Sequence, residues 1–227
     1  MKHMLKWLGA AVVLALPSAA VGQVLNFEGI VPSGTQYVPV GNWYNGGAGP
    51  NYGISFSSNA LAICLQATGS NCPNTNSSRG GLGDPGSQLG ALFFLDGPAT
   101  YMSRSSGFTS GFSFFYSAIS SPGAFSVWSG MDGAGSLLAT VLLPLTSSGN
   151  PNCFGTGFCP YFPIGVNFVG TAMSVSFEGV ADEIVFDDVT FGSSTPGNVV
   201  PEPASMTLLA TGLVGVFGAA RRRRKSA

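Results

Sequence analysis

The side chains that could do chemistry in this 227-residue chain are mainly carboxylates. Between Gln23 and Val199 there is no histidine and no lysine, and only Arg79 and Arg104 oppose nine carboxylates, a formal charge of −7. Nucleophilic triads and dyads that need His or Lys are therefore excluded from this region. A basic footprint for nucleic acid is missing as well, so we expect no nucleic-acid partner.

Acids near the two ends of this region could bind calcium. Glu28 lies near its start, and Asp187 and Asp188 lie near its end. Calcium takes about six to eight oxygen ligands from carboxylates, amides and backbone carbonyls. If the first and last strands pair, as they often do in jelly-roll domains, Glu28 comes close to Asp187 or Asp188. A structural calcium is the one candidate cofactor; the alternative is that these acids cap turns and charge a sheet edge.

Catalysis by carboxylates alone has little support in the pattern. Glycoside hydrolysis needs two acids, but the other acids are scattered and share no motif. The string Gly81–Gly86 fits GxGxxG, although Asp84-Pro85 favours a turn over the strand and helix that a dinucleotide site needs. We expect a protein that is not an enzyme.

A dense group of aromatic and amide side chains is a candidate for contact with a glycan. It consists of Asn42, Trp43 and Tyr44, with Tyr52 close behind. Flat aromatic faces and planar amides suit the faces and hydroxyls of sugars. The alternative is that Trp43 fills the core, because a body so poor in Leu and Ile must be packed with aromatic rings.

Four cysteines indicate an oxidising compartment. Local pairing joins Cys64 to Cys72 and Cys153 to Cys159, and each pair encloses its own loop. Zinc is the rival interpretation, but the region offers no histidine and no CxxC spacing.

Short β-rich runs separated by Gly, Pro, Asn and Ser predict an all-β body over residues 23–192. We predict a two-sheet antiparallel β-sandwich of the jelly-roll type, with a β-helix as the alternative. Phe112, Phe114 and Tyr116 should share one face, and Asp187-Asp188 should mark a bulge in the last strand. The predicted strands are Val24–Ile30, Gly53–Ser57, Leu61–Gln66, Ala91–Leu95, Ala99–Ser103, Gly111–Tyr116, Ala124–Trp128, Leu137–Leu143, Met173–Phe177 and Glu183–Phe191.

The N-terminal residues 1–22 are typical of a signal peptide. Lys2 and Lys6 precede a short apolar run, and Pro17 and small residues follow it. We predict cleavage between Gly22 and Gln23, with Ala20 as the alternative site.

At the C-terminal end, a linker over 193–199 leads to a processing segment over 200–227. Pro201, Glu202 and Pro203 are followed by an apolar stretch, 204–220. A helix of this length barely crosses a bilayer, and the basic cluster after it would stay on the cytoplasmic side. That cluster is Arg221, Arg222, Arg223, Arg224 and Lys225.

Pro-Glu-Pro, an apolar helix and a terminal Arg cluster, in this order, resemble the PEP-CTERM sorting signal of bacterial envelopes. The resemblance covers about the last 28 residues. It implies that an exosortase, a transient partner, cleaves near Pro201–Pro203 and passes the body to the surface or the extracellular polysaccharide. Residues 45–47 and 51–56 also resemble secreted proteins that share this tail, which mostly lack an assigned activity.

These features predict an exported protein with a membrane-anchored precursor that ends at the cell surface or in the matrix. Its body would associate, without catalysis, with exopolysaccharide. The alternative is a structural or adhesive matrix component that binds itself through exposed β edges and has no glycan site.

Overall fold

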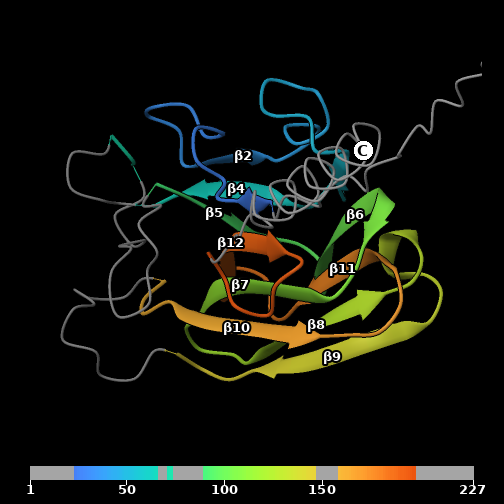
Figure 1. Ribbon diagram of the computed structural model, residues 1–227. Helices are drawn as coiled ribbons and strands as arrows, with labels where there is room; N and C mark the ends of the chain where they lie inside the picture. The colour runs from blue at the N-terminus through green and yellow to red at the C-terminus, as the bar shows by residue number, and fades with distance from the viewer. Residues whose placement is uncertain (1–22, 66–70, 74–88, 147–157, 198–227) are drawn as a thin grey trace, which may run out of the picture. The chain divides into compact units, whose positions relative to one another are not determined.

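The computed structural model describes residues 23–65, 71–73, 89–146 and 158–197, which form two antiparallel sheets (Figure 1). Residues 22–200 make one compact unit. Because both sheets and their cores lie inside this unit, we expect the body to fold by itself. The predicted signal peptide, the Pro-Glu-Pro segment, the C-terminal apolar stretch and the Arg cluster lie outside the described residues.

The larger sheet has the strand order β10-β7-β12-β5-β4-β2, and β1 also pairs with β12. The smaller sheet has the order β3-β6-β11-β8-β9. The strand bounds are β1 Val24–Leu25, β2 Tyr37–Pro39, β3 Ile54–Phe56, β4 Leu61–Cys64, β5 Gly90–Phe93, β6 Ala99–Phe108, β7 Gly111–Ala118, β8 Gly123–Trp128, β9 Leu137–Leu143, β10 Phe162–Asn167, β11 Ala172–Glu178 and β12 Ile184–Phe191. A 3₁₀ turn, η1 (Met131–Gly133), lies between β8 and β9.

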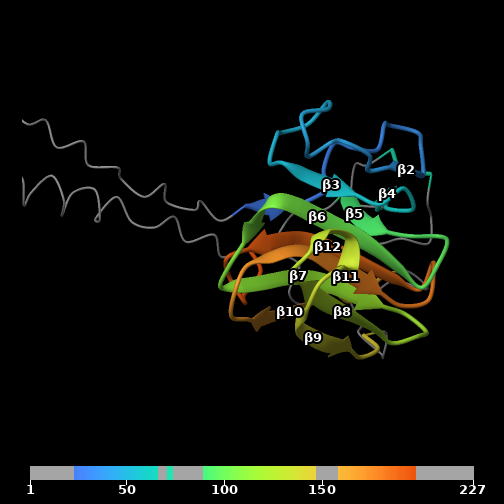
Figure 2. The ribbon, with the colours of Figure 1, turned by 90° about the vertical axis from the view of Figure 1, so that its right-hand side faces the viewer.

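The last eight strands have the connectivity of a jelly roll. In one sheet β5, β12, β7 and β10 are neighbours, and in the other β6, β11, β8 and β9 are neighbours. This strand order is that of two Greek keys, in which the chain passes between the sheets at each step except from β8 to β9. The prediction of an all-β jelly-roll sandwich is confirmed. The β-helix alternative is wrong, because the strand pairs of both sheets are antiparallel. Figures 1 and 2 both show β9 and β10 on the lower side of the body.

Aromatic rings fill the space between the sheets. Phe112, Phe114 and Tyr116 of β7 all belong to this core, as the alternation predicted. Phe114 meets Phe125 of the opposite sheet edge to face, with ring centroids 4.8 Å apart. Such pairs add to the free energy of burial, which explains how a body with few Leu and Ile residues is packed.

A second, smaller cluster covers the outer face of the larger sheet. Phe115 of β7 and Val185 of β12 pack there with Phe158 and Tyr161, which precede β10. Strands β7 and β12 are therefore buried on both faces. The residues that cover this outer face come from the segment around Cys159, which is itself disulfide-bonded.

Strands β2 and β10 were not predicted from the sequence, and each lies at an edge of the larger sheet. Strand β2 ends in Pro39, and β10 contains Pro163 and Gly165. Proline cannot donate to a ladder and is tolerated at edges, so a pattern that treats it as a breaker misses such strands. Within the described segments no helix is long and apolar enough to cross a membrane.

Candidate functional site

The candidate site lies where the start of the body meets its last strand. Strand β1 pairs antiparallel with β12, and Leu25 lies opposite Val189. The segment that follows β1 therefore runs beside the strand that carries Asp187 and Asp188. The first and last strands do pair, which was the condition for bringing Glu28 to these acids.

Asp187 and Asp188 lie where β12 changes its neighbour. On one side Phe186 pairs with β5, whereas Val189 pairs with β1. On the other side the register with β7 shifts between Asp187 and Thr190, so the predicted bulge is confirmed. Asp187 is 0% exposed and Asp188 is 4% exposed, and the Asp188 amide donates to Asp187 Oδ1 at 2.7 Å. The sequence expectation of solvated edge charges does not fit this burial.

The Glu28 side chain connects the segment after β1 to the start of β5 by hydrogen bonds. Its Oε1 accepts hydrogen bonds from the amides of Leu89, at 2.7 Å, and Gly90, at 3.2 Å. Glu28 thus caps the start of β5. A Cβ at Gly90 would overlap the carbonyl of Phe27, so the close approach of these two segments requires glycine there.

Two non-glycine residues of this corner have left-handed backbone conformations. Phe27 has φ 55° and Asp188 has φ 48°. Such conformations are rare for a bulky side chain and cost about 1–3 kcal/mol each, so the surrounding contacts must hold them. Left-handed non-glycine residues cluster at ligand-binding sites, and the sequence pattern does not predict these conformations.

Tyr44 connects the acids to the aromatic loop, but it lies inside the body. Its ring is 2% exposed, and its hydroxyl accepts a hydrogen bond from the Phe27 amide at 2.9 Å. Burial raises the pKa of Tyr44 above its usual range, and the charges of Asp187 and Glu28 raise it further. Both acids therefore act on one phenol. The expectation that Tyr44 contacts a glycan is corrected, because its ring cannot reach a ligand from this position.

The other residues of the predicted glycan group lie nearer the surface. Asn42 is exposed, whereas Trp43 and Tyr52 are partly buried. A Cβ at Gly49 would overlap the Trp43 indole, so Gly49 lies against that ring. Tyr52 stacks on Tyr44 with ring centroids 6.0 Å apart and 12° between the planes.

Backbone hydrogen bonds make the loop around Trp43 compact. The Asn42 carbonyl accepts from the amides of Asn45 and Gly47, each at 3.0 Å, and the Tyr44 carbonyl accepts from Tyr52 at 2.9 Å. An isolated bridge joins Asn45 to Asn51. This local order presents Asn42 and the outer part of Trp43 on a fixed support.

A metal ion would find few carboxylates here. In the part of the chain that the structure describes, no three His, Cys, Asp or Glu side chains are grouped closely enough to hold one. Calcium also accepts carbonyl and amide oxygens. A site at Glu28, Asp187 and Asp188 would therefore need backbone oxygens from the same corner, where the Phe27 carbonyl lies against β5.

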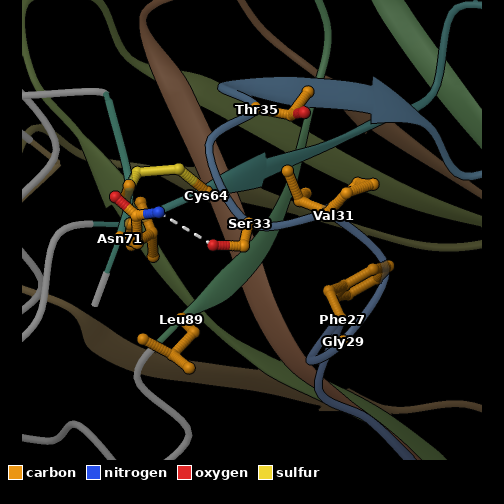
Figure 3. Close-up of a pocket in the computed structure, with 11 residues that line it drawn as sticks. Phe27, Gly29, Val31, Ser33, Thr35, Cys64, Asn71 and Leu89 are labelled. Carbon is orange, nitrogen blue, oxygen red and sulfur yellow. Dashed lines mark hydrogen bonds between the residues drawn. A yellow bond between two sulfur atoms is a disulfide. The ribbon is translucent and has the colours of Figure 1, made fainter. Parts of the chain in front are cut away.

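A cavity of about 330 Å³ opens beside this corner (Figure 3). Its wall includes the disulfide between Cys64 and Cys72, whose Cα atoms are 5.8 Å apart. Asn71 Nδ2 donates to Ser33 Oγ at 2.9 Å, which ties the disulfide loop to the segment before β2 (Figure 3). No motif or spacing in the sequence predicted this cavity. The lining residues are Phe27, Gly29, Val31, Pro32, Ser33, Thr35, Cys64, Leu65, Asn71, Cys72 and Leu89.

The predicted pairing of Cys64 with Cys72 is confirmed. Cys159 is disulfide-bonded too, and its predicted partner Cys153 lies outside the described residues. The first five residues of the predicted linker, 193–197, lie against the body. Ser113 Oγ donates to the Ser193 carbonyl at 2.8 Å, and the Gly197 amide donates to Thr190 Oγ1 at 3.1 Å.

Three crystal structures of cleaved adhesin domains of Lys-gingipain are similar to the chain. They are the K1 and K3 domains from Porphyromonas gingivalis W83, with 13% and 14% identity and TM-scores of 0.39 and 0.38, and the K2 domain, with 11% identity and a TM-score of 0.39. Each alignment covers 75% of this chain and 96% of K1, 98% of K3 and 98% of K2. No curated protein matches the chain.

The family model for the PEP-CTERM protein-sorting motif matches residues 199–224. The match contains Pro201, Glu202 and Pro203, the apolar stretch and the four arginines. This motif indicates an exported protein of the envelope or surface that is processed by an exosortase. The chain carries a jelly-roll body followed by a PEP-CTERM protein-sorting motif.

Proposed function

We propose that the body is a non-catalytic module that associates with exopolysaccharide at the cell surface or in the extracellular matrix. The sorting motif at residues 199–224 carries this proposal. It directs the body to a place where polysaccharide surrounds the cell, and the body presents aromatic and amide groups that suit a sugar.

The loop around Trp43 is the proposed glycan contact. Asn42 supplies an exposed amide, and Trp43 and Tyr52 supply partly exposed rings. The buried Tyr44 supports them from below through its stack with Tyr52. A rigid loop loses little conformational entropy on binding, which favours recognition of a repeated sugar unit.

The arrangement of the acids favours binding over catalysis. Glu28 Oε1 is engaged by two backbone amides, and Asp187 and Asp188 are buried in β12. A glycosidase needs an acid and a second carboxylate on opposite sides of an accessible bond. The body also has no histidine or lysine to serve as a general base.

We also propose a structural calcium at Glu28, Asp187 and Asp188. Two features support it: the burial of Asp187 and Asp188 at the bulge, and the left-handed conformations of Phe27 and Asp188 at the same corner. Because these three acids do not form one group of side chains in the described residues, backbone oxygens would have to complete the set of ligands. The ion would fix the junction of β1, β5 and β12 below the glycan loop, so its role would be to hold this corner in shape.

Exosortase is the proposed processing partner, with cleavage near Pro201, Glu202 and Pro203. The precursor would be held in the inner membrane by residues 204–220 until then, with the arginines 221–224 in the cytoplasm. Replacing Glu202 with Ala in the producing organism should leave the protein in the membrane fraction. Its unchanged release would contradict this step.

Self-association is the second candidate function, and the exposed apolar edge strand β9 favours it. A single experiment separates the two candidates. The body, Gln23–Val199, is exported so that its disulfides form, and is passed over the producing organism's own exopolysaccharide. Retention supports the glycan proposal. Recovery of the body in the unbound fraction, both with calcium and with chelator, would contradict the glycan proposal and leave the self-association candidate.

A further inference from the structure

Strand β9 is an edge strand without the charges and prolines that usually protect one. Among the described strands it has a neighbour on one side only, β8. Its sequence, LLATVLL, contains no charge, no proline and no glycine. Natural edge strands avoid unwanted pairing by charges, prolines or bulges. The one register shift of β9 lies near its start, so its regular, uncharged part, Ala139–Leu143, is a template for another strand.

Exposed apolar side chains gather along this border of the sandwich. Leu142 of β9 is 78% exposed, and Leu137 and Leu145 are exposed at its two ends. Leu142 lies opposite the small Ala124 of β8, so its own sheet leaves it uncovered.

The distribution of charge on the body is compatible with a second copy of the chain as the partner of this edge. The body has a formal charge of −7, so two copies repel each other over most of their surface. Residues 133–146 contain no ionisable side chain, so pairing along this border brings no like charges together. An edge strand also needs an extended partner, and a second β9 offers the same apolar sequence.

The regular part of β9 complements itself. A register shift with β8 separates Leu137 from Ala139, and Ala139–Leu143 then pair without interruption. Antiparallel pairing of this stretch with itself about Val141 keeps core-facing residues opposite core-facing residues. We infer that β9 pairs with β9 of a second copy of this chain, which joins the two smaller sheets into one continuous sheet across a two-fold axis.

This inference deepens the self-association candidate by naming its surface and its partner, and it does not rest on the glycan proposal. A two-fold contact between identical strands is closed, so it gives a dimer and not a fibre. The two glycan loops of such a dimer would bind one polymer with a gain from multivalency. The dimer is stabilised by backbone hydrogen bonds and apolar contact, so added salt should strengthen it by screening the repulsion between the bodies.

The test is sedimentation of the body, Gln23–Val199, over a series of concentrations, with one variant at the edge and one matched control. Leu142→Lys places two like charges on the same face of the paired strands and should raise the dimer dissociation constant at least about tenfold. Val169→Lys adds the same charge at a turn residue that is 92% exposed, and should leave the dimer unchanged.

Hydrogen exchange identifies the surface independently of the variants. Slower amide exchange at high concentration should be confined to β9, and the fraction of dimer should rise with salt. A monomer at every soluble concentration overturns the inference. So does a dimer that Leu142→Lys and Val169→Lys weaken equally, or one whose protected amides lie outside β9. In any of these cases retention on polysaccharide by the monomer would leave the glycan proposal intact.

Discussion

The backbone amide of Phe27 donates a hydrogen bond to the phenol oxygen of Tyr44 across 2.9 Å. This bond joins two groups that the sequence places far apart, the acids around Glu28 and the aromatic loop around Trp43. Phe27 holds a left-handed conformation next to Glu28, and Tyr44 supports Tyr52 by stacking. A substitution that alters the segment around Glu28 should therefore alter the loop around Trp43, and the reverse.

Removal of this hydrogen bond by Tyr44→Phe should destabilise the body by about 1–3 kcal/mol, because it leaves the Phe27 amide buried without its partner. For a body of this size the melting temperature should fall by roughly 2–4 °C for each kcal/mol. Thermal unfolding followed by circular dichroism measures the change. Tyr52→Phe removes a phenol oxygen from the ring stacked on Tyr44 and is the matched control; equal losses in both variants would show that the Phe27–Tyr44 bond adds nothing.

The contact of Gly49 with the Trp43 indole can be tested by fluorescence. In a Trp128→Phe background, the body has Trp43 as its single tryptophan. Gly49→Ala should displace the indole and shift its emission, because the new Cβ would overlap the ring. Ala48→Ser is the control in the same loop, since Ala48 is exposed and the change adds a single hydroxyl group. Emission that is the same in the Gly49 variant and the parent would mean that the loop does not hold Trp43 in this way.

Calcium should raise the melting temperature of the body, and chelator should reverse the rise. A ligand at about 100 times its dissociation constant stabilises the folded state by about 2.7 kcal/mol. Asp187→Asn should abolish the calcium effect, whereas Asp182→Asn, at an exposed turn, should preserve it. Identical melting curves with calcium and with chelator would remove the metal site.

The pH dependence of stability should show a small contribution from Asp182. Partial burial and the neighbouring charge of Glu183 raise the pKa of Asp182. An acid whose pKa is raised on folding binds its proton more tightly in the folded state, so stability falls as the pH rises from the unfolded pKa, about 4, through the folded value. Asp182→Asn should therefore be neutral or stabilising at pH 7, and the difference from the parent should vanish in acid. Destabilisation by Asp182→Asn that is larger at pH 7 than in acid would contradict this sign.

Much of the fold was predictable because local pattern and global topology agree. Alternation placed Phe112, Phe114 and Tyr116 in the core, and a polar Asp187-Asp188 step in an apolar strand indicated the bulge. The strands that were missed, β2 and β10, contain proline at sheet edges, where the ladder can spare a donor.

The site was less predictable, since it depends on long-range contacts. Glu28, Asp187 and Trp43 were candidates in the sequence and remain proposals. Tyr44 was expected to contact a ligand and is buried, because nothing in the sequence around it distinguishes it from the less buried Trp43. The left-handed Phe27 and the cavity behind the Cys64–Cys72 loop follow from the way β1, β5 and β12 meet. No spacing in the sequence encodes that junction.

Binding of the body to the producing organism's exopolysaccharide, compared between the parent, Trp43→Ala and Phe162→Ala, tests the central claim most directly. Phe162 is an exposed aromatic residue on β10 and serves as the control for the loss of a ring. With folding of each variant checked by its melting curve, we expect Trp43→Ala to weaken binding at least about tenfold, as the loss of a central aromatic anchor does, and Phe162→Ala to bind like the parent. Equal binding by all three proteins, or none by the parent, would contradict a glycan-binding role for this loop.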